Sequence, residues 1–473
     1  MTRLMRMLAC GLCLLVSVAG VQAQELAAEI DQVMSEFVEL DLFSGTVLVA
    51  KGGVPVYARA FGEANKDHHV ANTLETRFNI GSIGKTLTGT AIMQLVDRGE
   101  VELEAAVARY LEDFPYGDTI RIHHLLSHTS GMFNYMAHPE YRARMTSLRR
   151  IDDFLPLIYD QHLVFETPGE RFAYSNSGIV VLGAVIEKVS GMPYEEFIAK
   201  NILGPAGMTS TGINFWDEVV PNRAMGYTKG LTGRFTAAVY QVPPACADGG
   251  LETTVLDLLR FDRALAGDTL ISEESKQKMY TPNLDDYGYT WSIRERAGRR
   301  SISHGGGAPG VSAMFARFPD DDVTIIVLSN YSEGAIEPAR AIEAIVFGTE
   351  FRPPRPPLGE ALYRAVDGGQ IEVTPSAIGA EIERRGYQLR SPQTLNFVGY
   401  EFLGVGEVDV AVAIFELNVE RFPDDANSYD SLGEAYLANG DREQGIAAYK
   451  KALEVDPEFE NARQVLERMG ALP

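Results

Sequence analysis

The order of strand-like and helical segments constrains the fold of this chain more than any other feature. Runs with strand character lie within residues 45–61 and again within 290–328, whereas the stretch between them, about 101–215, is mostly of helical period. Strands from distant parts of a chain can join in one sheet, with the helices between them packed beside it. We therefore predict an α+β fold, with an antiparallel sheet flanked by helices and a helical subdomain. A cleft between the two parts is the expected place for an active site.

Apolar spacing and turn residues locate the individual elements. A turn at residues 51–53 joins the first two strands into a hairpin, and the helix that starts at Ser82 has Gly99 as a stop signal. Helices are predicted over 26–38, 82–101, 151–159, 177–189, 194–202 and 336–346, and strands over 45–50, 54–61, 290–293, 301–303, 311–318 and 323–328.

The proline-rich run Arg352–Pro357 ends the first folding unit, because such a run favours extended backbone and cannot continue a helix. Beyond it, Pro423 and Pro457 are 34 residues apart, which is the period of the tetratricopeptide repeat. The residues that resemble this family are Tyr429, Leu432, Gly433, Tyr436, Gly445, Tyr449, Ala452 and Pro457 in one repeat and Gly399, Phe402, Ala411, Phe415 and Pro423 in a degenerate one.

These patterns predict four parts of the chain. Residues 1–23 form a signal peptide, 24–350 a first domain, 351–391 a proline-rich linker with connecting helices, and 392–473 an all-α tetratricopeptide segment. Two repeats are usually too few to stand alone, so we expect residues 459–469 to cap them and the array to lean on the preceding domain. The resemblance implies a protein partner, or a role in covering the first domain, and the sequence leaves both open.

The N-terminus has the pattern of a secretory signal peptide. Arg3 and Arg6 precede the apolar run Met7–Val18, which ends in the small-residue cleavage pattern Val21–Ala23. A membrane anchor is the alternative, but the run is shorter than the ~20 residues a spanning helix needs. We expect export across the inner membrane to the periplasm, with no membrane span after cleavage. Of the three cysteines only Cys246 would remain, so no internal disulfide is expected.

Charge and histidine spacing exclude several function classes. The formal net charge of −23 repels nucleic acid and anionic lipid, so neither is an expected partner. None of the eight histidines shows tight metal-ligand spacing, and we expect solvated or core roles for most of them. We therefore predict a protein that needs neither a metal nor an organic cofactor.

Ser82 and Lys85 form a Ser-x-x-Lys pair, which places both side chains on one helix face within hydrogen-bonding reach. The spacing alone is weak evidence, since Ser275 and Lys278 share it, but that pair lies in a charged run predicted to be a solvated helix face. Ser82 instead precedes a long apolar helix. The N-terminus of such a helix offers a backbone N–H and a positive dipole end to a developing oxyanion.

Tyr174-Ser175-Asn176 is distinctive, because no other tyrosine in the chain is followed two residues later by asparagine. A phenol near Lys85 could relay the proton of Ser82 and later deliver it to a leaving group. Asn176 could orient the lysine and donate to a substrate carbonyl. The alternative is a buried tyrosine that caps the following helix.

His304 to Gly307 follow a short predicted strand. Glycines there would let a substrate lie along the backbone, and Gly307 could donate its N–H as a second oxyanion contact. Alternatively, Gly305, Gly306 and Gly307 form only a turn between strands. No serine has the G-x-S-x-G surroundings of an α/β-hydrolase nucleophile.

In this order the three groups resemble the serine β-lactamase and penicillin-binding protein superfamily, in detail its class C branch. The resemblance covers about 26–348 and includes the stretches 120–131, 248–254, 287–291 and 304–310. It implies a β-lactamase/transpeptidase-like fold. It also implies roles for individual residues: the acylated nucleophile is Ser82, the base system Lys85 and Tyr174, the substrate contacts Asn176, His304, Gly305 and Gly306, and the oxyanion donors Ser82 and Gly307.

The third motif departs from the pattern of class C β-lactamases, which carry Lys-Thr-Gly where this chain has His304-Gly305-Gly306. A histidine is mostly neutral above about pH 6.5, so recognition of a substrate carboxylate is weakened or passed to another residue. Histidine at this position resembles D-alanyl-D-alanine carboxypeptidases, and loss of the lysine also resembles the esterases of the fold.

We therefore expect an exported serine hydrolase that cleaves an ester or amide through an acyl-enzyme on Ser82. Esterase, D-amino-acid peptidase and weak β-lactamase activities stay unranked. The alternative is an inactive module that binds a peptidoglycan fragment or peptide and presents partners to the tetratricopeptide segment. The presence of Ser82, Lys85 and Tyr174 together argues against it.

Overall fold

The computed structural model describes residues 24–238 and 243–472, so the predicted signal peptide lies outside the described residues. The chain divides into two compact units. The first takes Met1–Thr228 and Ala237–Pro354, and the second takes Lys229–Thr236 and Arg355–Pro473. In the described ranges no helix is both long enough and apolar enough to cross a membrane.

A six-stranded antiparallel sheet forms the centre of the first unit, in the order β2-β1-β12-β11-β10-β9. Its strands are β1 (Gly45–Lys51), β2 (Val54–Phe61), β9 (Ser292–Arg296), β10 (Arg299–Ala308), β11 (Val311–Phe318) and β12 (Val323–Ser329). The early hairpin joins the late strands where β1 pairs with β12, from Gly45 opposite Ser329 to Lys51 opposite Val323. The expected α+β fold is confirmed.

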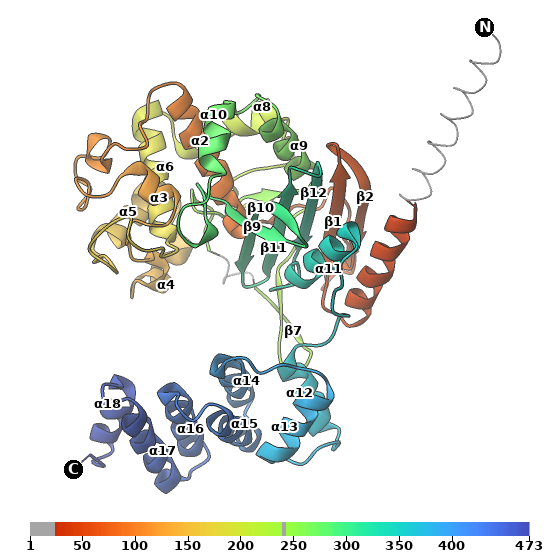
Figure 1. Ribbon diagram of the computed structural model, residues 1–473, viewed down its shortest axis with the longest axis vertical. Helices are drawn as coiled ribbons and strands as arrows, with labels where there is room; N and C mark the ends of the chain where they lie inside the picture. Colours follow the sequence, from red (N-terminus) through yellow and green to blue (C-terminus); the bar gives the residue numbers. More distant parts are fainter. Residues whose placement is uncertain (1–23, 239–242, 473) are drawn as a thin grey trace, which may run out of the picture. The chain divides into compact units, whose positions relative to one another are not determined.

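The inner strands β1, β11 and β12 are buried on both faces of the sheet, and their successive side chains point to opposite sides. Val47 and Ile325 face a core built with the helical residues 24–39 and with α11 (Ile336–Phe347), which lies across the sheet in Figure 1. Leu48 and Ile326 face the other core, which contains α2 (Gly84–Asp97) and α9 (Val255–Ala266). A strand buried on both faces reads as a continuous apolar run, as β1 and β12 do.

The helical part lies beside the sheet, to its left in Figure 1. Helix α6 is buried along most of its length, since it packs against α2, α3 and α5. The helices of this part are α3 (Ile122–Leu126), α4 (Tyr141–Arg144), α5 (Ile151–Tyr159), α6 (Asn176–Ser190), α7 (Tyr194–Ile198) and α8 (Gly204–Ala206), with a π-helical turn over Ala199–Leu203. The predicted helices over 151–159 and 177–189 agree with α5 and α6.

One sequence expectation about this unit is wrong and another needs only a change of detail. The helix predicted to start at Ser82 opens with a 3₁₀ turn, η1 (Gly81–Ile83), and ends at Asp97, two residues before the predicted stop at Gly99. The second Ser-x-x-Lys pair lies on α10 (Glu273–Met279), but Ser275 is buried there and donates to Asp97 Oδ1 over 2.6 Å. The charged run does not indicate this burial, because Asp97, the partner of the Ser275 hydroxyl, is far away in the sequence.

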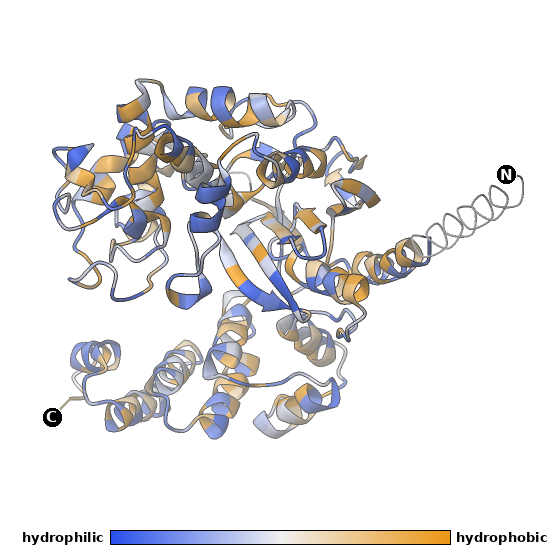
Figure 2. Ribbon diagram, turned by 45° about the horizontal axis from the view of Figure 1, so that its top comes forward, coloured by the Kyte–Doolittle hydropathy of each residue, from blue (hydrophilic) through white to orange (hydrophobic). Residues whose placement is uncertain are grey.

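The second unit is all helical apart from residues 229–236, where Leu231 joins the helical core and Lys229 Nζ lies 3.0 Å from Glu360 Oε2. In Figure 2 hydrophobic and hydrophilic residues alternate along its helices, as expected for amphipathic helices that share a core. The helices are α12 (Leu358–Asp367), α13 (Pro375–Arg384), α14 (Pro392–Gly404), α15 (Val408–Arg421), α16 (Ala426–Ala438), α17 (Arg442–Val455) and α18 (Glu460–Arg468).

One contact recurs in the two helical hairpins α14–α15 and α16–α17. Gly399 lies against the ring of Phe415, and Gly433 lies against the ring of Tyr449, so closely that a Cβ on either glycine would overlap the ring. The pairs are 34 residues apart. The degenerate repeat thus keeps the packing of the well-matched one, and the predicted tetratricopeptide architecture is confirmed.

Candidate active site

Ser82 lies on the short turn η1, where a hydrogen bond joins it to Lys85. Lys85 is fully buried at the start of α2, and its Nζ donates to Ser82 Oγ over 3.0 Å. The turn is fixed by Gly81, whose φ of 49° is left-handed and whose N–H donates to Asn79 Oδ1 over 2.8 Å. The predicted pair is therefore brought together as the i, i+3 spacing required.

Strand β10 packs its backbone directly on this turn, which only glycine allows. A Cβ on Gly306 would overlap the carbonyl oxygen of Ile80 and lie 3.1 Å from Ser82 N. A Cβ on Gly81 would lie 2.9 Å from Gly307 N. The backbone nitrogens of Ser82 and Gly307 therefore lie on two segments that are packed against each other. Beside Gly307 the space is open, since the described residues place no atom within 4 Å of an added Cβ.

The third motif lies inside a strand and does not follow one. Strand β10 continues from Arg299 to Ala308, so the prediction of a short strand that ends at Ser303 is wrong, and so is the alternative of a simple turn. In the described chain β9 pairs with β10 only as far as Ser303. Beyond it, residues 304–308 have no described strand on the β9 side, and a substrate could lie along that edge of β10. Glycine has low strand propensity, and here the close approach to η1 outweighs it.

Tyr174 covers Lys85. The Lys85 nitrogen lies 5.2 Å from the centroid of the Tyr174 ring, which is 39% exposed. The residue at the N-cap of α6 is Ser175, so the alternative of a buried, helix-capping tyrosine is wrong. The structure thus brings the Tyr174 ring, the buried amine and the Ser82 hydroxyl into one cluster.

His128 forms the wall behind Tyr174, and its place there was not predicted. The two ring centroids are 4.2 Å apart, and Ser175 N–H donates to His128 Nδ1 over 3.3 Å. His128 is 1% exposed, and its burial together with the nearby Lys85 holds its pKa well below the usual value. The imidazole is therefore neutral. The sequence showed His128 only as part of a stretch typical of the family.

The structure gives Asn176 partners other than the lysine. It is buried at the start of α6, where its Nδ2 lies 3.2 Å from Met136 Sδ, and its Oδ1 has no hydrogen-bond partner among the described residues. Lys85 instead donates to the backbone carbonyl of Asp248. The role of Asn176 beside the lysine therefore stays a prediction.

Asp248 is a second unpredicted member of the site. It is buried, its Oδ2 accepts from Tyr135 Oη over 3.0 Å, and burial raises the pKa of its carboxyl group. A Cβ on the next residue, Gly249, would overlap the Gly81 carbonyl and lie 3.3 Å from Ser82 N. The Asp248-Gly249-Gly250 sequence is thus the signal that could have located this contact.

His304 has both ring nitrogens engaged by the protein. Its Nδ1 lies 2.6 Å from the Gly305 carbonyl oxygen, which can only accept, so Nδ1 carries the hydrogen. Its Nε2, 2.9 Å from Tyr287 Oη, then accepts from the tyrosine. Burial and the nearby Lys85 lower the pKa of His304 to about 4. His304 therefore offers a substrate neither a charge nor a free N–H.

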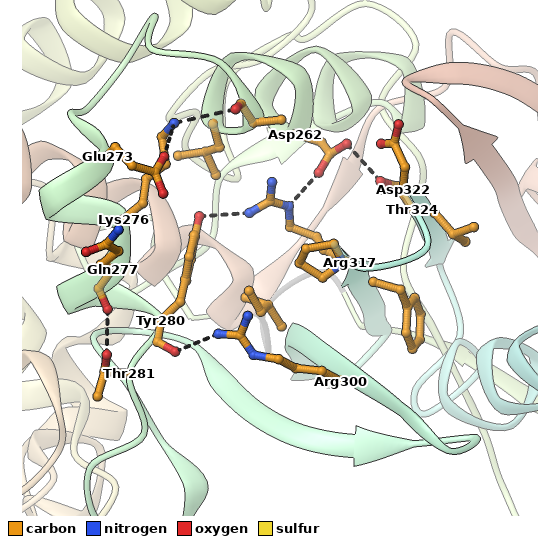
Figure 3. A pocket seen from close by; sticks show the side chains of 16 residues that line it. Asp262, Glu273, Lys276, Gln277, Tyr280, Thr281, Arg300, Arg317, Asp322 and Thr324 are labelled. Carbon is orange, nitrogen blue, oxygen red and sulfur yellow. Dashed lines mark hydrogen bonds and ion pairs between the residues drawn. The ribbon is translucent and has the colours of Figure 1, made fainter.

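Two hollows lie in the first unit. One, of about 210 Å³, is lined by Asn79, Trp216 and Gly310 among others and contains none of the predicted site residues. The larger, of about 620 Å³, lies near the start of β10 and contains none of the predicted site residues. Figure 3 shows Arg317 bound to Asp262 and to the Tyr280 hydroxyl, and Arg300 bound to the Tyr280 carbonyl.

Neither Cys246 nor the metal-ligating side chains of the described residues point to a second site. Cys246 is buried, and burial raises the pKa of its thiol well above the usual value, so a reactive thiolate is disfavoured. Within residues 24–238 and 243–472, no three histidine, cysteine or acidic side chains are grouped so that they could hold a metal ion.

Known proteins share both the sequence and the fold. The beta-lactamase family model matches residues 30–348, and the tetratricopeptide repeat model matches 426–459. Penicillin-binding protein 4* of Bacillus subtilis strain 168 is 34% identical over 351 residues, which are 69% of this chain and 77% of that protein.

Solved structures agree with this assignment. A penicillin-binding protein from Bacillus halodurans superposes with a TM-score of 0.61 at 33% identity, over 67% of this chain and 98% of its own. A D-stereospecific amidohydrolase from Streptomyces sp. superposes with a TM-score of 0.60 over 68% and 99% of the two chains, and at 24% identity it shows the fold alone. The chain belongs to the beta-lactamase family of serine hydrolases and carries a tetratricopeptide repeat near its C-terminus.

Proposed function

We propose that this protein is an exported serine hydrolase that forms an acyl-enzyme on Ser82 and cleaves esters or amides. The observation that carries the proposal is the hydrogen bond from the fully buried Lys85 Nζ to Ser82 Oγ, with the Tyr174 ring beside the same nitrogen. A hydroxyl bound to a buried amine is the arrangement that activates a serine nucleophile. Export rests on the N-terminal sequence, where Arg3 and Arg6 precede an apolar run.

The reaction proceeds in two halves. Ser82 Oγ attacks the substrate carbonyl while its proton passes to the Lys85–Tyr174 pair, and the resulting oxyanion is stabilised by the N–H groups of Ser82 and Gly307. The C–O or C–N bond then breaks, and the leaving group takes the proton from Tyr174. Water attacks the acyl-enzyme in the second half and gives its proton to the same pair, which restores the Ser82 hydroxyl and releases the acid.

The neutral state of His304 supports substrates without a carboxylate beside the scissile bond. A carboxylate that leaves water needs a cation or several donors to offset its desolvation, and both His304 nitrogens are already engaged. Esters and amides of uncharged groups do not carry this cost. We therefore rank ester and amide hydrolysis above D-alanyl carboxypeptidase and β-lactamase activity.

A four-substrate panel tests this ranking. We expect kcat/KM for a short-chain nitrophenyl ester and for a D-amino-acid amide to exceed that for a D-alanyl-D-alanine peptide and a cephalosporin at least about tenfold. Protein taken from the periplasm is used, and its mass reports whether residues 1–23 have been removed. Each rate is compared with that of Ser82→Ala. A higher value for the peptide or the cephalosporin would contradict the ranking.

The alternative is an inactive module that binds a peptidoglycan fragment or peptide, and it is favoured only by the tetratricopeptide segment. Such repeats are typical of protein interaction, so we propose that α14–α18 bind a protein partner of the hydrolase unit. Binding of a peptide without turnover of any panel substrate would support the inactive module. Loss of a co-purifying protein on removal of residues 392–473 would support the partner.

A further inference from the structure

Tyr287 is a buried residue that contacts His304. His304 stands where class C β-lactamases have the lysine of the third motif. The Tyr287 hydroxyl reaches His304 Nε2, and the geometry of Nδ1 against the Gly305 carbonyl leaves Nε2 only the role of acceptor. We propose that Tyr287 is a specificity-determining residue that holds His304 in its neutral Nδ1–H form and so makes the site reject substrates with a carboxylate beside the scissile bond. The inference rests on the proposed function and extends it.

The position of Tyr287 is set by its own loop. Its N–H donates to the Leu284 carbonyl over 3.2 Å, and its carbonyl accepts from Asn283 N–H over 2.9 Å. The next residue, Gly288, packs so closely on α10 that a Cβ would overlap the Met279 carbonyl oxygen. Because the backbone is held by these contacts, replacing Tyr287 by phenylalanine removes the hydroxyl and keeps the ring in place.

The groups around His304 favour the neutral imidazole. Lys85 faces it from α2, Tyr174 from the segment before α6, and His128 from the loop after α3 lies against the same aromatic cluster. Burial holds the pKa of the Tyr287 phenol well above its usual value, so the phenol stays an O–H donor. A donor to Nε2 opposes protonation there.

Removal of the Tyr287 hydroxyl therefore changes what His304 can do. Nε2 loses its donor while Nδ1 keeps its bond to the Gly305 carbonyl. A buried acceptor without a partner takes a proton or a water more readily, and a proton there would give the site the cation that a carboxylate needs. We expect the variant to accept carboxylated substrates better and to do so increasingly as the pH falls.

Two esters that differ only in charge test the claim. The substrates are 3-carbamoylphenyl acetate and 3-carboxyphenyl acetate, which share the acyl group and the position of the substituent. We expect the wild type to favour the carbamoyl ester at least about tenfold in kcat/KM, and Tyr287→Phe to reduce that ratio by about tenfold, mainly below pH ~6. The control is Tyr289→Phe, two residues away and partly buried, which should keep the wild-type ratio.

A measurement that needs no activity tests the same hydrogen bond. Nitrogen-15 NMR of histidine-labelled protein, with the His304 signals assigned from His304→Gln, should show the Nδ1–H tautomer and no titration above pH ~5 in the wild type. In Tyr287→Phe the midpoint should rise by at least about one pH unit.

The possible failures are distinguishable. A wild-type His304 that titrates at its ordinary value or carries its hydrogen on Nε2 overturns the role of Tyr287, even if the enzyme is active. The same follows if Tyr287→Phe is folded, hydrolyses the carbamoyl ester and keeps the wild-type ratio. Absence of hydrolysis of either ester by the wild type overturns the proposed function.

Discussion

Replacing Ser82 by alanine should lower kcat/KM for a neutral ester by about 10⁴-fold or more, because no acyl-enzyme can then form. Lys85 would lose the hydroxyl that it contacts over 3.0 Å but keep its bond to the Asp248 carbonyl, so the buried amine stays partly satisfied and the fold should persist. Initial rates of ester hydrolysis measure the loss, and circular dichroism checks the fold.

Ser275→Ala is the matched control for this substitution. Ser275 has the same spacing to a lysine, lies on a helix of the same unit and is buried, but its hydroxyl donates to Asp97. We expect this variant to hydrolyse the ester within about twofold of the wild-type rate. Removing a hydroxyl group that lies outside the active site lowers the stability of the fold but does not change the reaction. Comparable loss in both variants would contradict the assignment of Ser82 as nucleophile.

Gly306→Ala should have the second largest effect, at least about 100-fold on kcat, which is the cost of losing one oxyanion donor. A methyl group at Gly306 overlaps the Ile80 carbonyl, so β10 must move away from η1 and take Gly307 N–H with it. The Michaelis constant should change less than kcat, because the donor acts mainly on the charge that develops during reaction. Steady-state kinetics at matched folded concentration separates the two constants.

Gly267→Ala serves as the control for the added methyl group. Gly267 follows α9 with a φ of −86°, and a Cβ there would meet its nearest atom at an ordinary 3.6 Å. We expect activity and melting temperature close to those of the wild type. If Gly306→Ala is equally well tolerated, then the close packing of β10 on the Ser82 turn does not matter for the reaction.

Local features of the site could be predicted from the sequence, and long-range ones could not. The Ser82–Lys85 contact follows from helical spacing, whereas the bond from Lys85 to the Asp248 carbonyl spans 163 residues. His128 and Tyr287 likewise reach the site from other parts of the chain, and the sequence marks them only as members of stretches that resemble the family. Their positions depend on how α3, α6 and β9 pack, which spacing does not encode.

The errors in secondary structure have the same cause. Strand β10 was predicted to end before the glycines, because glycine has low strand propensity, yet contact with η1 keeps Gly305–Gly307 extended. Helix α10 was predicted to be solvated, because its sequence is charged, yet Asp97 receives the buried hydroxyl of Ser275. In both places a tertiary contact outweighs the local preference.

The tetratricopeptide repeats show the opposite case, in which a short pattern carries the packing. The first repeat has lost several of the expected residues, but Gly399 and Phe415 keep the contact that Gly433 and Tyr449 make in the second. A small residue that accepts an aromatic ring from the paired helix is the packing that the two hairpins share. That contact could be predicted because both members lie within one repeat.

The most direct test of acyl transfer at Ser82 is covalent labelling. The wild-type protein is treated with an activated fluorophosphonate, and the modified residue is located by peptide mass spectrometry. We expect one adduct, on the peptide that contains Ser82, and no adduct in Ser82→Ala. An adduct on another residue, or sustained ester hydrolysis by a wild-type protein that the reagent does not modify, would contradict the assignment of Ser82 as the nucleophile.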